Sequence, residues 1–388
     1  MARLSFLFLL IFLHVVVIVL ITSSPCESTT TNFSEHYSPE KCSAALFIFG
    51  DSFFDAGNNN YINTTTLDQA NFWPYGETFF RFPTGRFSDG RLIPDFVAEY
   101  ANLPLISPFL QPGFRHYNDG VNFASSGAGA LVETFQGSVI DLKTQLRNYK
   151  KVEGWLRHKV GSVGAEVTLS KAVYLFSIGT NDYMSIFLTN STVLTTFSHS
   201  QYVHMVIGNL TAVLKEIYTL GGRKFGFMNL PEFGCSPGIR ITKQDTDGSC
   251  IKEASTLTKL HNQALSKLLM KLEKQLKGFK YSLYDLSSNL RHRMNHPSKF
   301  GTHTTTGSRK GKQHAVEQAS LEECSAVEEK GWGSRSTICV IIPMNMCFWD
   351  SYHLTENAYK QLALQMWTGT GISHSVGPYT LKDLFEAH

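Results

Sequence analysis

The sequence predicts an α/β fold in which helices cover both faces of a central parallel sheet. Apolar runs of strand length occur at residues 44–49 and 172–178, further strands are predicted at residues 225–230 and 279–286, and segments with helical spacing lie between them. Strands that alternate with helices form right-handed βαβ crossovers, which make neighbouring strands parallel and bury both sheet faces. We therefore expect a single three-layer α/β/α sandwich.

The composition is that of a globular enzyme. The 388 residues are 43% hydrophobic and 17% charged, which is enough apolar material for one large core or two small ones. The formal net charge is only +3, and no long block of Lys and Arg is present. These values argue against a nucleic-acid partner.

The first apolar run, residues 44–49, is uninterrupted, as expected of a strand buried on both faces. It stops at Gly50-Asp51-Ser52, a small turn at the carboxyl end of the strand. Ligands of open α/β sheets bind at this edge. A serine there can face a substrate while its backbone N–H points at a developing oxyanion, so Ser52 is a candidate nucleophile.

The second strand, residues 172–178, ends in a similar way, at Gly179-Thr180-Asn181-Asp182. Asn and Asp are also ordinary turn formers. Two polar strand ends that meet at one edge of a sheet favour a functional site over a simple turn. We assign Asp182 a structural role.

Glycine is concentrated at residues 120–129, G-V-N-F-A-S-S-G-A-G. Such density lets the backbone approach a ligand closely. Taken alone, the pattern is more simply a turn between a strand and a loop.

Helices are predicted at residues 92–100, 145–158, 203–220 and 250–276. The last of them has an apolar face that is most simply core packing. That face consists of Leu257, Leu260, Ala264, Leu268 and Leu272.

Two other segments are predicted to be irregular. Residues 58–82 are rich in Asn, Thr and aromatic residues, which indicates a surface loop. Residues 73–91 contain several Gly and Pro, which favour irregular structure, and we expect this segment near the site.

A carboxylate stands three residues before a histidine near the C-terminus, at Asp350 and His353. A carboxylate at this spacing can orient the imidazole and stabilise its protonated form, and the imidazole can then take a proton from a serine hydroxyl. The chain has 14 histidines, so one of them alone would be a weak indication.

Residues 4–22 are almost continuously apolar, with Arg3 before them and Thr22-Ser23-Ser24 after them. This pattern predicts a cleaved signal peptide at residues 1–26 and a secreted, extracellular protein without a stable membrane span. The alternative is an uncleaved membrane anchor, because the run approaches the ~20 residues that can cross a bilayer.

Four N-glycosylation sequons agree with secretion; they begin at Asn32, Asn63, Asn190 and Asn209. The chain has seven cysteines, which in an oxidising compartment favours disulfides. Cys235 and Cys250 bracket a polar loop and are the expected pair. Cys26 either leaves with the signal peptide or remains as an odd thiol.

The motif F-G-D-S-F-F-D-A-G-N-N at residues 49–59 resembles the first block of the plant GDSL esterase/lipases, in the SGNH hydrolase superfamily. The resemblance covers roughly residues 44–385, and Phe53 replaces the usual leucine. Within this family the chain is most similar to the GDSL lipases linked with defence signalling.

The resemblance implies a flavodoxin-like α/β/α fold and a site made of several blocks. Ser52, Asp350 and His353 match the catalytic triad. The oxyanion hole would consist of the backbone N–H groups of Ser52 and Gly127 and the side-chain amide of Asn181. No metal and no organic cofactor are expected.

Residues 302–346 lack the character of the rest of the chain. The family has Cys-Cys-Gly and Cys-Gly-Gly motifs here, and neither is present in frame. Back-translation one phase over permits codons for both motifs, so we interpret roughly residues 310–346 as translated out of frame. The alternatives are an exposed, poorly ordered loop or a zinc site. Cys324, Cys339 and Cys347 lack the close ligand pairs of zinc sites, which disfavours the latter.

The sequence therefore predicts a domain at residues 42–388 that hydrolyses carboxylic esters, of lipids or of other acyl compounds, and the resemblance implies a role in defence. Two alternatives stay open. The acyl-enzyme could be resolved by an alcohol, which makes the protein an acyltransferase, or the chain could be a catalytically impaired secreted binding protein. The sequence indicates neither the ester nor an oligomeric state.

Overall fold

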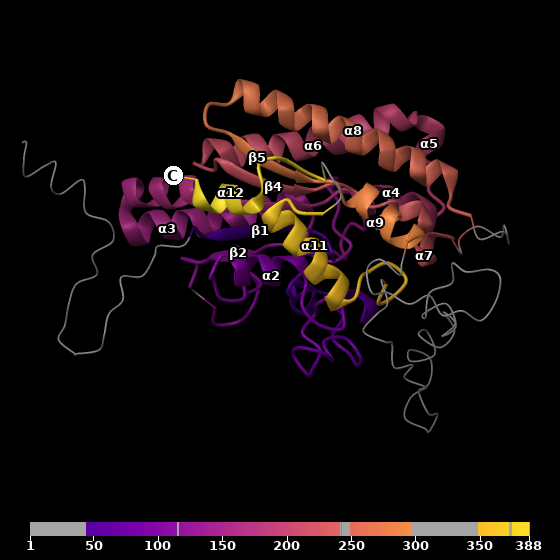
Figure 1. Cartoon of the computed structure of the whole chain (residues 1–388), viewed down its shortest axis with the longest axis horizontal. Helices are drawn as coiled ribbons and strands as arrows, with labels where there is room; N and C mark the ends of the chain where they lie inside the picture. The colour runs from indigo at the N-terminus through magenta and orange to yellow at the C-terminus, as the bar shows by residue number, and fades with distance from the viewer. Residues whose placement is uncertain are drawn as a thin grey trace, which may run out of the picture. The chain divides into compact units, whose positions relative to one another are not determined.

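A six-stranded sheet lies at the centre of the part of the chain that the structure, a computed structural model, describes (Figure 1). The described residues are 44–114, 116–240, 242, 249–296, 348–371 and 375–387. The strands, in sheet order, are β2 (Gly120–Asn122), β1 (Leu46–Gly50), β3 (Val173–Ser177), β4 (Lys224–Met228), β5 (Lys280–Tyr284) and β6 (Val376–Pro378).

Strands β1 to β5 are all parallel to their neighbours, as the alternation of strands and helices predicts. The sheet is not parallel throughout, because β6, at one edge, pairs antiparallel with β5. This last strand has three residues and includes Pro378, which cannot donate to a ladder and is tolerated at an edge. Its V-G-P sequence has no apolar run that could reveal it.

The helices flank the sheet. They are α2 (Ile93–Tyr100), α3 (Leu142–Lys171), α4 (Thr180–Leu188), α5 (Val193–Thr196), α6 (His199–Thr219), α7 (Pro237–Arg240), α8 (Lys252–Gln275), α9 (Leu286–Asn295), α11 (Glu356–Thr368) and α12 (Leu381–Glu386). Three short 3₁₀ helices are η1 (Asn58–Tyr61), η2 (Leu67–Gln69) and η3 (Phe233–Cys235).

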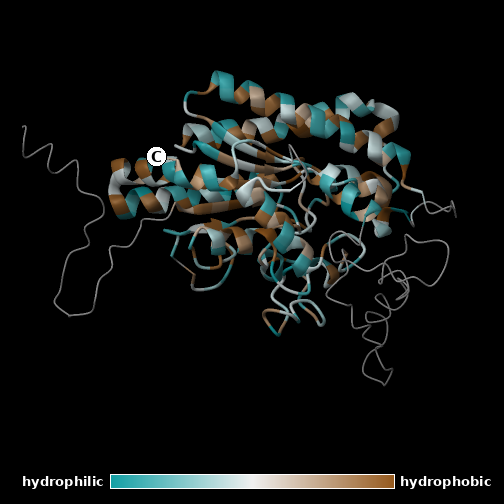
Figure 2. Ribbon diagram, in the orientation of Figure 1, coloured by the Kyte–Doolittle hydropathy of each residue, from teal (hydrophilic) through white to brown (hydrophobic). Residues whose placement is uncertain are grey.

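Successive residues of each strand face opposite sides of the sheet and join two separate cores. In β1, Phe47 and Phe49 pack into the core covered by α3, α6 and α8. Leu46 and Ile48 pack into the core covered by α2, α11 and α12. Figure 2 shows the strands largely hydrophobic and the helices striped. Each fully buried side chain of this kind contributes roughly 1.5–3 kcal/mol. The predicted three-layer α/β/α fold is therefore confirmed.

Capping groups account for where several helices begin. Ser198 and Gln201 form a capping box at the start of α6, and the Asp141 side chain accepts the N–H of Thr144 at the start of α3. α3 extends further than the predicted 145–158, as far as Lys171. It is interrupted at Gly161, whose φ of 75° lies outside the helical region.

The prediction that residues 58–82 form a surface loop is wrong at their start. Asn58 and Asn59, in η1, are fully buried. They can be buried because their side-chain amides find hydrogen-bond partners inside the protein, which removes the cost of taking them out of water.

Several predictions concern segments outside the fold described so far. The signal peptide at 1–26, Cys26, Asn32 and the segment 302–346 lie outside the described residues. Asn63, Asn190 and Asn209 are exposed. No helix within the described ranges is long and apolar enough to cross a membrane.

Cys235 and Cys250 are joined by a disulfide that links η3 to the start of α8. The two cysteines are 15 residues apart, so the bond closes a loop and lowers the entropy of the unfolded chain.

Replacing both cysteines, C235S/C250S, should lower the free energy of unfolding by about 3 kcal/mol, the value expected for a loop of this size. Denaturant unfolding of wild-type and variant protein measures this. Each single variant should match the double variant, because both cysteines contribute through one bond. Equal stability of wild-type and double variant would contradict the prediction.

Candidate active site

Ser52 lies on a tight turn directly after β1. Gly50 has a φ of 150°, and a β-carbon there would collide with the carbonyl oxygen of Ser177 on β3. The turn is closed by the N–H groups of Phe54 and Asp55, which donate to the carbonyl of Asp51 at 3.0 Å. Ser52 itself is only 8% exposed.

His353 and Asp350 complete a hydrogen-bonded chain with this serine. The Nε2 atom of His353 is 2.7 Å from Ser52 Oγ. Its Nδ1 atom is 2.9 Å from Oδ1 and 2.8 Å from Oδ2 of Asp350. The structure therefore brings together the three residues that the sequence nominated as a catalytic triad.

Asp350 is held under its histidine by a turn of the chain itself. Its Oδ1 atom accepts the backbone N–H groups of Tyr352 and His353, both at 2.8 Å. Burial alone would raise the pKa of Asp350, but the imidazole of His353 and these hydrogen bonds lower the pKa below its ordinary value. The group is thus an anion that can orient an imidazole and stabilise its protonated form.

Three hydrogen-bond donors lie at neighbouring strand ends. Gly127 follows β2 in a left-handed conformation, with φ of 77°. The backbone N–H groups of Ser52 and Gly127 have no acceptor among the described residues. Asn181, in the first turn of α4, donates one amide hydrogen to the carbonyl of Ala128 at 3.0 Å, and its second hydrogen remains for another acceptor.

Asp182, expected to be structural, connects α4 to the loop that follows Gly127. It is fully buried, and its carboxylate accepts the N–H groups of Ala130 and Leu131 and the hydroxyl of Thr134. It therefore holds the start of α4, which contains Asn181, close to the loop that contains Gly127.

Three buried residues, to which the sequence assigned no role, hold the glycine-rich segment at residues 120–129 in place. Asp55 accepts the N–H of Ser126 at 3.0 Å. Asn59 donates to the carbonyl of Ser126 and accepts the hydroxyl of Ser125. Asn58 donates to the carbonyl of Asn122, at the end of β2, and to that of Ala124, at 2.9 and 2.8 Å. All three stand in the block that contains Ser52, which was the available indication.

Gln145, in the first turns of α3, clamps the strand that carries the serine. Its side-chain oxygen accepts the N–H of Gly50 at 2.9 Å, and its nitrogen donates to the carbonyl of Gly50 at 2.8 Å. The side chain is fully buried and replaces the partner that a further strand residue would supply. The sequence indicated a helix here, but not this contact.

The expectation that residues 73–91 lie near the site agrees with their contacts to the segment around His353. Glu356 accepts hydrogen bonds from the Thr78 hydroxyl and the Arg91 guanidinium, both at 2.7 Å. Its backbone N–H donates to Asp89. The hydroxyl of Ser88 donates to the carbonyl of Leu354 at 3.1 Å. These contacts dock the histidine segment onto residues 73–91, which we call the cradle segment.

Aromatic rings shield the imidazole from water. The ring centroid of Phe87, in the cradle segment, lies 4.7 Å from that of His353, and the ring centroid of Phe53 lies 5.8 Å from it. Phe53 occupies the position of the usual leucine, so the replacement keeps an apolar group at this contact.

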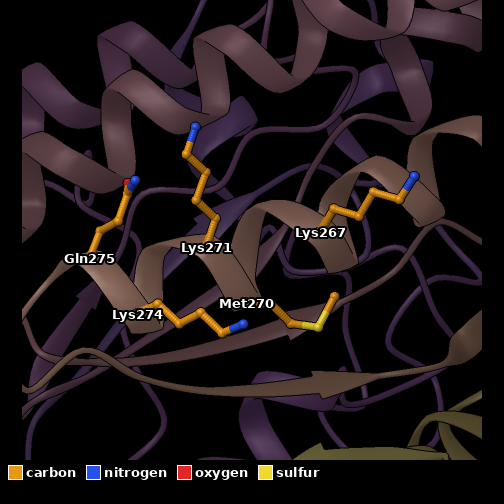
Figure 3. Close-up of a pocket in the computed structure, with 5 residues that line it drawn as sticks. All are labelled: Lys267, Met270, Lys271, Lys274 and Gln275. Atoms are coloured by element: carbon orange, nitrogen blue, oxygen red, sulfur yellow. The ribbon is translucent and has the colours of Figure 1, made fainter.

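A shallow hollow of about 330 Å³ lies elsewhere, on the outer face of α8 (Figure 3). It is lined by Lys267, Met270, Lys271, Lys274 and Gln275. The three ammonium groups point in different directions, and none of the lining residues belongs to the serine site. The hollow therefore offers no arrangement for ester chemistry.

Comparison with known proteins decides the family. The profile of the family described as GDSL-like Lipase/Acylhydrolase matches residues 46–366. The chain belongs to this family. The family predicted from the sequence is confirmed, and with it the class of carboxylic ester hydrolases.

Relatives from Arabidopsis thaliana extend over most of this GDSL-like chain. GDSL esterase/lipase 5 is 55% identical, over 88% of this chain and 87% of the relative. GDSL esterase/lipase 2 is 45% identical, over 97% and 98%. A more distant relative, inactive GDSL esterase/lipase-like protein 25, is 31% identical over 90% and 76%. Because one relative is named as inactive, the activity of a member depends on the site that it carries.

The GDSL-like site contains buried carboxyls that make stability depend on pH. Burial raises the pKa of Asp51 to about 7 and the pKa values of Asp55 and Asp182 to about 6. An aspartate with a raised pKa stabilises the fold below its unfolded pKa, and this contribution is lost as pH rises through the folded pKa. Burial lowers the pKa of His261 to about 3, which acts in the opposite direction below its ordinary pKa.

Three carboxyls stabilise the fold as pH falls, and one imidazole destabilises it. The melting temperature should therefore rise as pH is lowered from about 7.5 to about 5. Thermal unfolding at a series of pH values measures this. The variant Asp182→Asn, which cannot titrate, should show a smaller rise. A melting temperature that falls steadily over this interval would show that other groups dominate.

Proposed function

We propose that the protein is a secreted serine hydrolase that cleaves carboxylic esters with Ser52, His353 and Asp350. The observation that carries the proposal is the continuous hydrogen-bonded chain from Ser52 Oγ through the imidazole of His353 to the carboxylate of Asp350. Nucleophile, base and orienting group stand within hydrogen-bonding distance, as the mechanism requires.

In this mechanism Ser52 Oγ attacks the acyl carbonyl while His353 takes the hydroxyl proton. Asp350 stabilises the imidazolium that results, and His353 then gives the proton to the departing alcohol. Water, activated by the same imidazole, attacks the acyl-enzyme and releases the acid. Each step uses one imidazole alternately as base and acid, so no further ionisable group is needed.

The negative charge of the tetrahedral intermediate needs donors that are in place beforehand. We infer that the N–H groups of Ser52 and Gly127 and the amide of Asn181 supply them. Two observations support this: the two N–H groups lack acceptors in the described part of the chain, and Asn181 has one hydrogen engaged with Ala128 and one to spare. The buried brace around Ser126 keeps the loop in position, which avoids reorganisation during the reaction.

We further propose secretion to the apoplast after cleavage of residues 1–26, and glycosylation at Asn63, Asn190 and Asn209 as well as Asn32. The exposure of the first three asparagines and the disulfide between Cys235 and Cys250 support an extracellular location. A role in lipid breakdown and plant defence rests on the resemblance described above.

A fluorophosphonate probe tests the nucleophile directly. The purified secreted protein should be labelled, and Ser52→Ala should not, because the probe reacts with an activated serine hydroxyl. A folded wild-type protein that resists the probe would contradict the proposal and favour an impaired binding protein. Added acceptor alcohols then separate hydrolysis, which yields free acid, from acyl transfer, which yields a new ester.

The oxyanion donor is tested with Asn181→Ala. The variant should hydrolyse a p-nitrophenyl ester with kcat lowered by about 10²-fold, equivalent to ~3 kcal/mol, and with little change in KM. Asn229→Ala, at the end of β4, is a matched control outside the site and should retain its kcat. A change in KM alone for Asn181→Ala would mean that this amide binds the ground state.

A further inference from the structure

The two carboxylate oxygens of Asp350 are held from different sides. Oδ1 accepts the backbone N–H groups of Tyr352 and His353, which belong to the same turn. Oδ2 accepts the hydroxyl of Tyr75 at 2.8 Å, across 275 residues of sequence. This hydrogen bond therefore reaches Asp350 from outside the turn itself.

Aromatic packing fixes the direction in which the Tyr75 hydroxyl points. The ring makes edge-to-face contacts with three aromatic rings. The centroid separations are 5.1 Å to Phe72, 5.8 Å to Phe87 and 6.1 Å to Trp349. Phe87 also packs on His353. The tyrosine therefore lies in a cluster that contacts both the imidazole and the residue before the carboxylate, and such packing limits its rotation.

We propose that Tyr75 is a positioning residue of the serine site, whose hydroxyl holds Oδ2 of Asp350 so that the carboxylate stays aligned with the Nδ1–H of His353. This inference rests on the proposed function. Without Tyr75, Oδ1 would still be fixed by the backbone and Oδ2 would still face the imidazole, but Oδ2 would lose the hydroxyl donor that sets its position.

Loss of this donor also changes how strongly the negative charge of the Asp350 carboxylate acts on His353. A hydrogen bond from a neutral hydroxyl spreads the negative charge of a carboxylate, so its removal makes Asp350 a stronger partner for a protonated imidazole. His353 should then titrate at higher pH. Among the described residues, the ionisable groups that interact electrostatically with the pair include Asp51, Tyr352 and Tyr359, and they are the same in wild-type and variant.

The substitution Tyr75→Phe removes the hydroxyl and keeps the ring. Its matched control is Tyr149→Phe, which removes a buried hydroxyl from the 3.0 Å pair with Tyr174 in the core under α3. We expect kcat for a p-nitrophenyl ester to fall about tenfold in Tyr75→Phe with KM unchanged. The acidic limb of the kcat/KM profile should move to higher pH. Tyr149→Phe should keep both quantities and lose only thermal stability.

A second readout does not need turnover. NMR titration of the His353 ring in the full-length Ser52→Ala protein, with and without Tyr75→Phe, should show a higher imidazole pKa when the hydroxyl is absent. An unmoved imidazole pKa would overturn the inference, whatever the activity. A rise in KM at constant kcat would also overturn it, because Tyr75 would then contact the substrate. Absence of Ser52-dependent turnover in wild-type protein would instead contradict the proposed function, and the titration would still decide the role of Tyr75.

Discussion

The hydrogen bond between Ser52 Oγ and His353 Nε2 is the contact on which the rest of the site depends. It joins two side chains 301 residues apart in the sequence at a distance of 2.7 Å. The two partners are placed by different elements of the same fold. Ser52 follows β1, which is buried on both faces, and His353 immediately precedes α11, which packs against α2. Closing so long a loop costs conformational entropy, which only the two packed cores can offset.

Around this contact the backbone is held by buried polar side chains rather than by regular secondary structure. Gln145 clamps Gly50, and Asp55 and Asn59 brace the turn before Gly127. A buried amide or carboxylate without a partner would cost free energy, so each of these side chains is bonded several times and has little freedom. The same bonds that satisfy the buried groups therefore keep the oxyanion donors in place, which is what electrostatic catalysis requires.

Much of this arrangement could be predicted from local pattern. The predicted strands agree with β1, β3, β4 and β5 to within two residues at each end. The indication is clearest for β1, because a strand buried on both faces is mostly apolar. Ser52 and the pair Asp350 and His353 stand in short motifs with a direct chemical meaning. β2 and β6 have three residues each and were not predicted as strands, since so short a pairing depends on its neighbour and not on its own sequence.

The sequence by itself thus determined the fold class, the family and the nominated serine, histidine and aspartate, because periodicity and motif spacing are local properties of the chain. Only the tertiary structure decided that Asn58 and Asn59 are buried, that Glu356 docks onto the cradle segment and that the Tyr75 hydroxyl reaches Asp350. These contacts join residues tens to hundreds of positions apart. The sequence around a polar side chain does not indicate whether its hydrogen-bond partner will be water or a distant carbonyl, because the tertiary packing determines that partner.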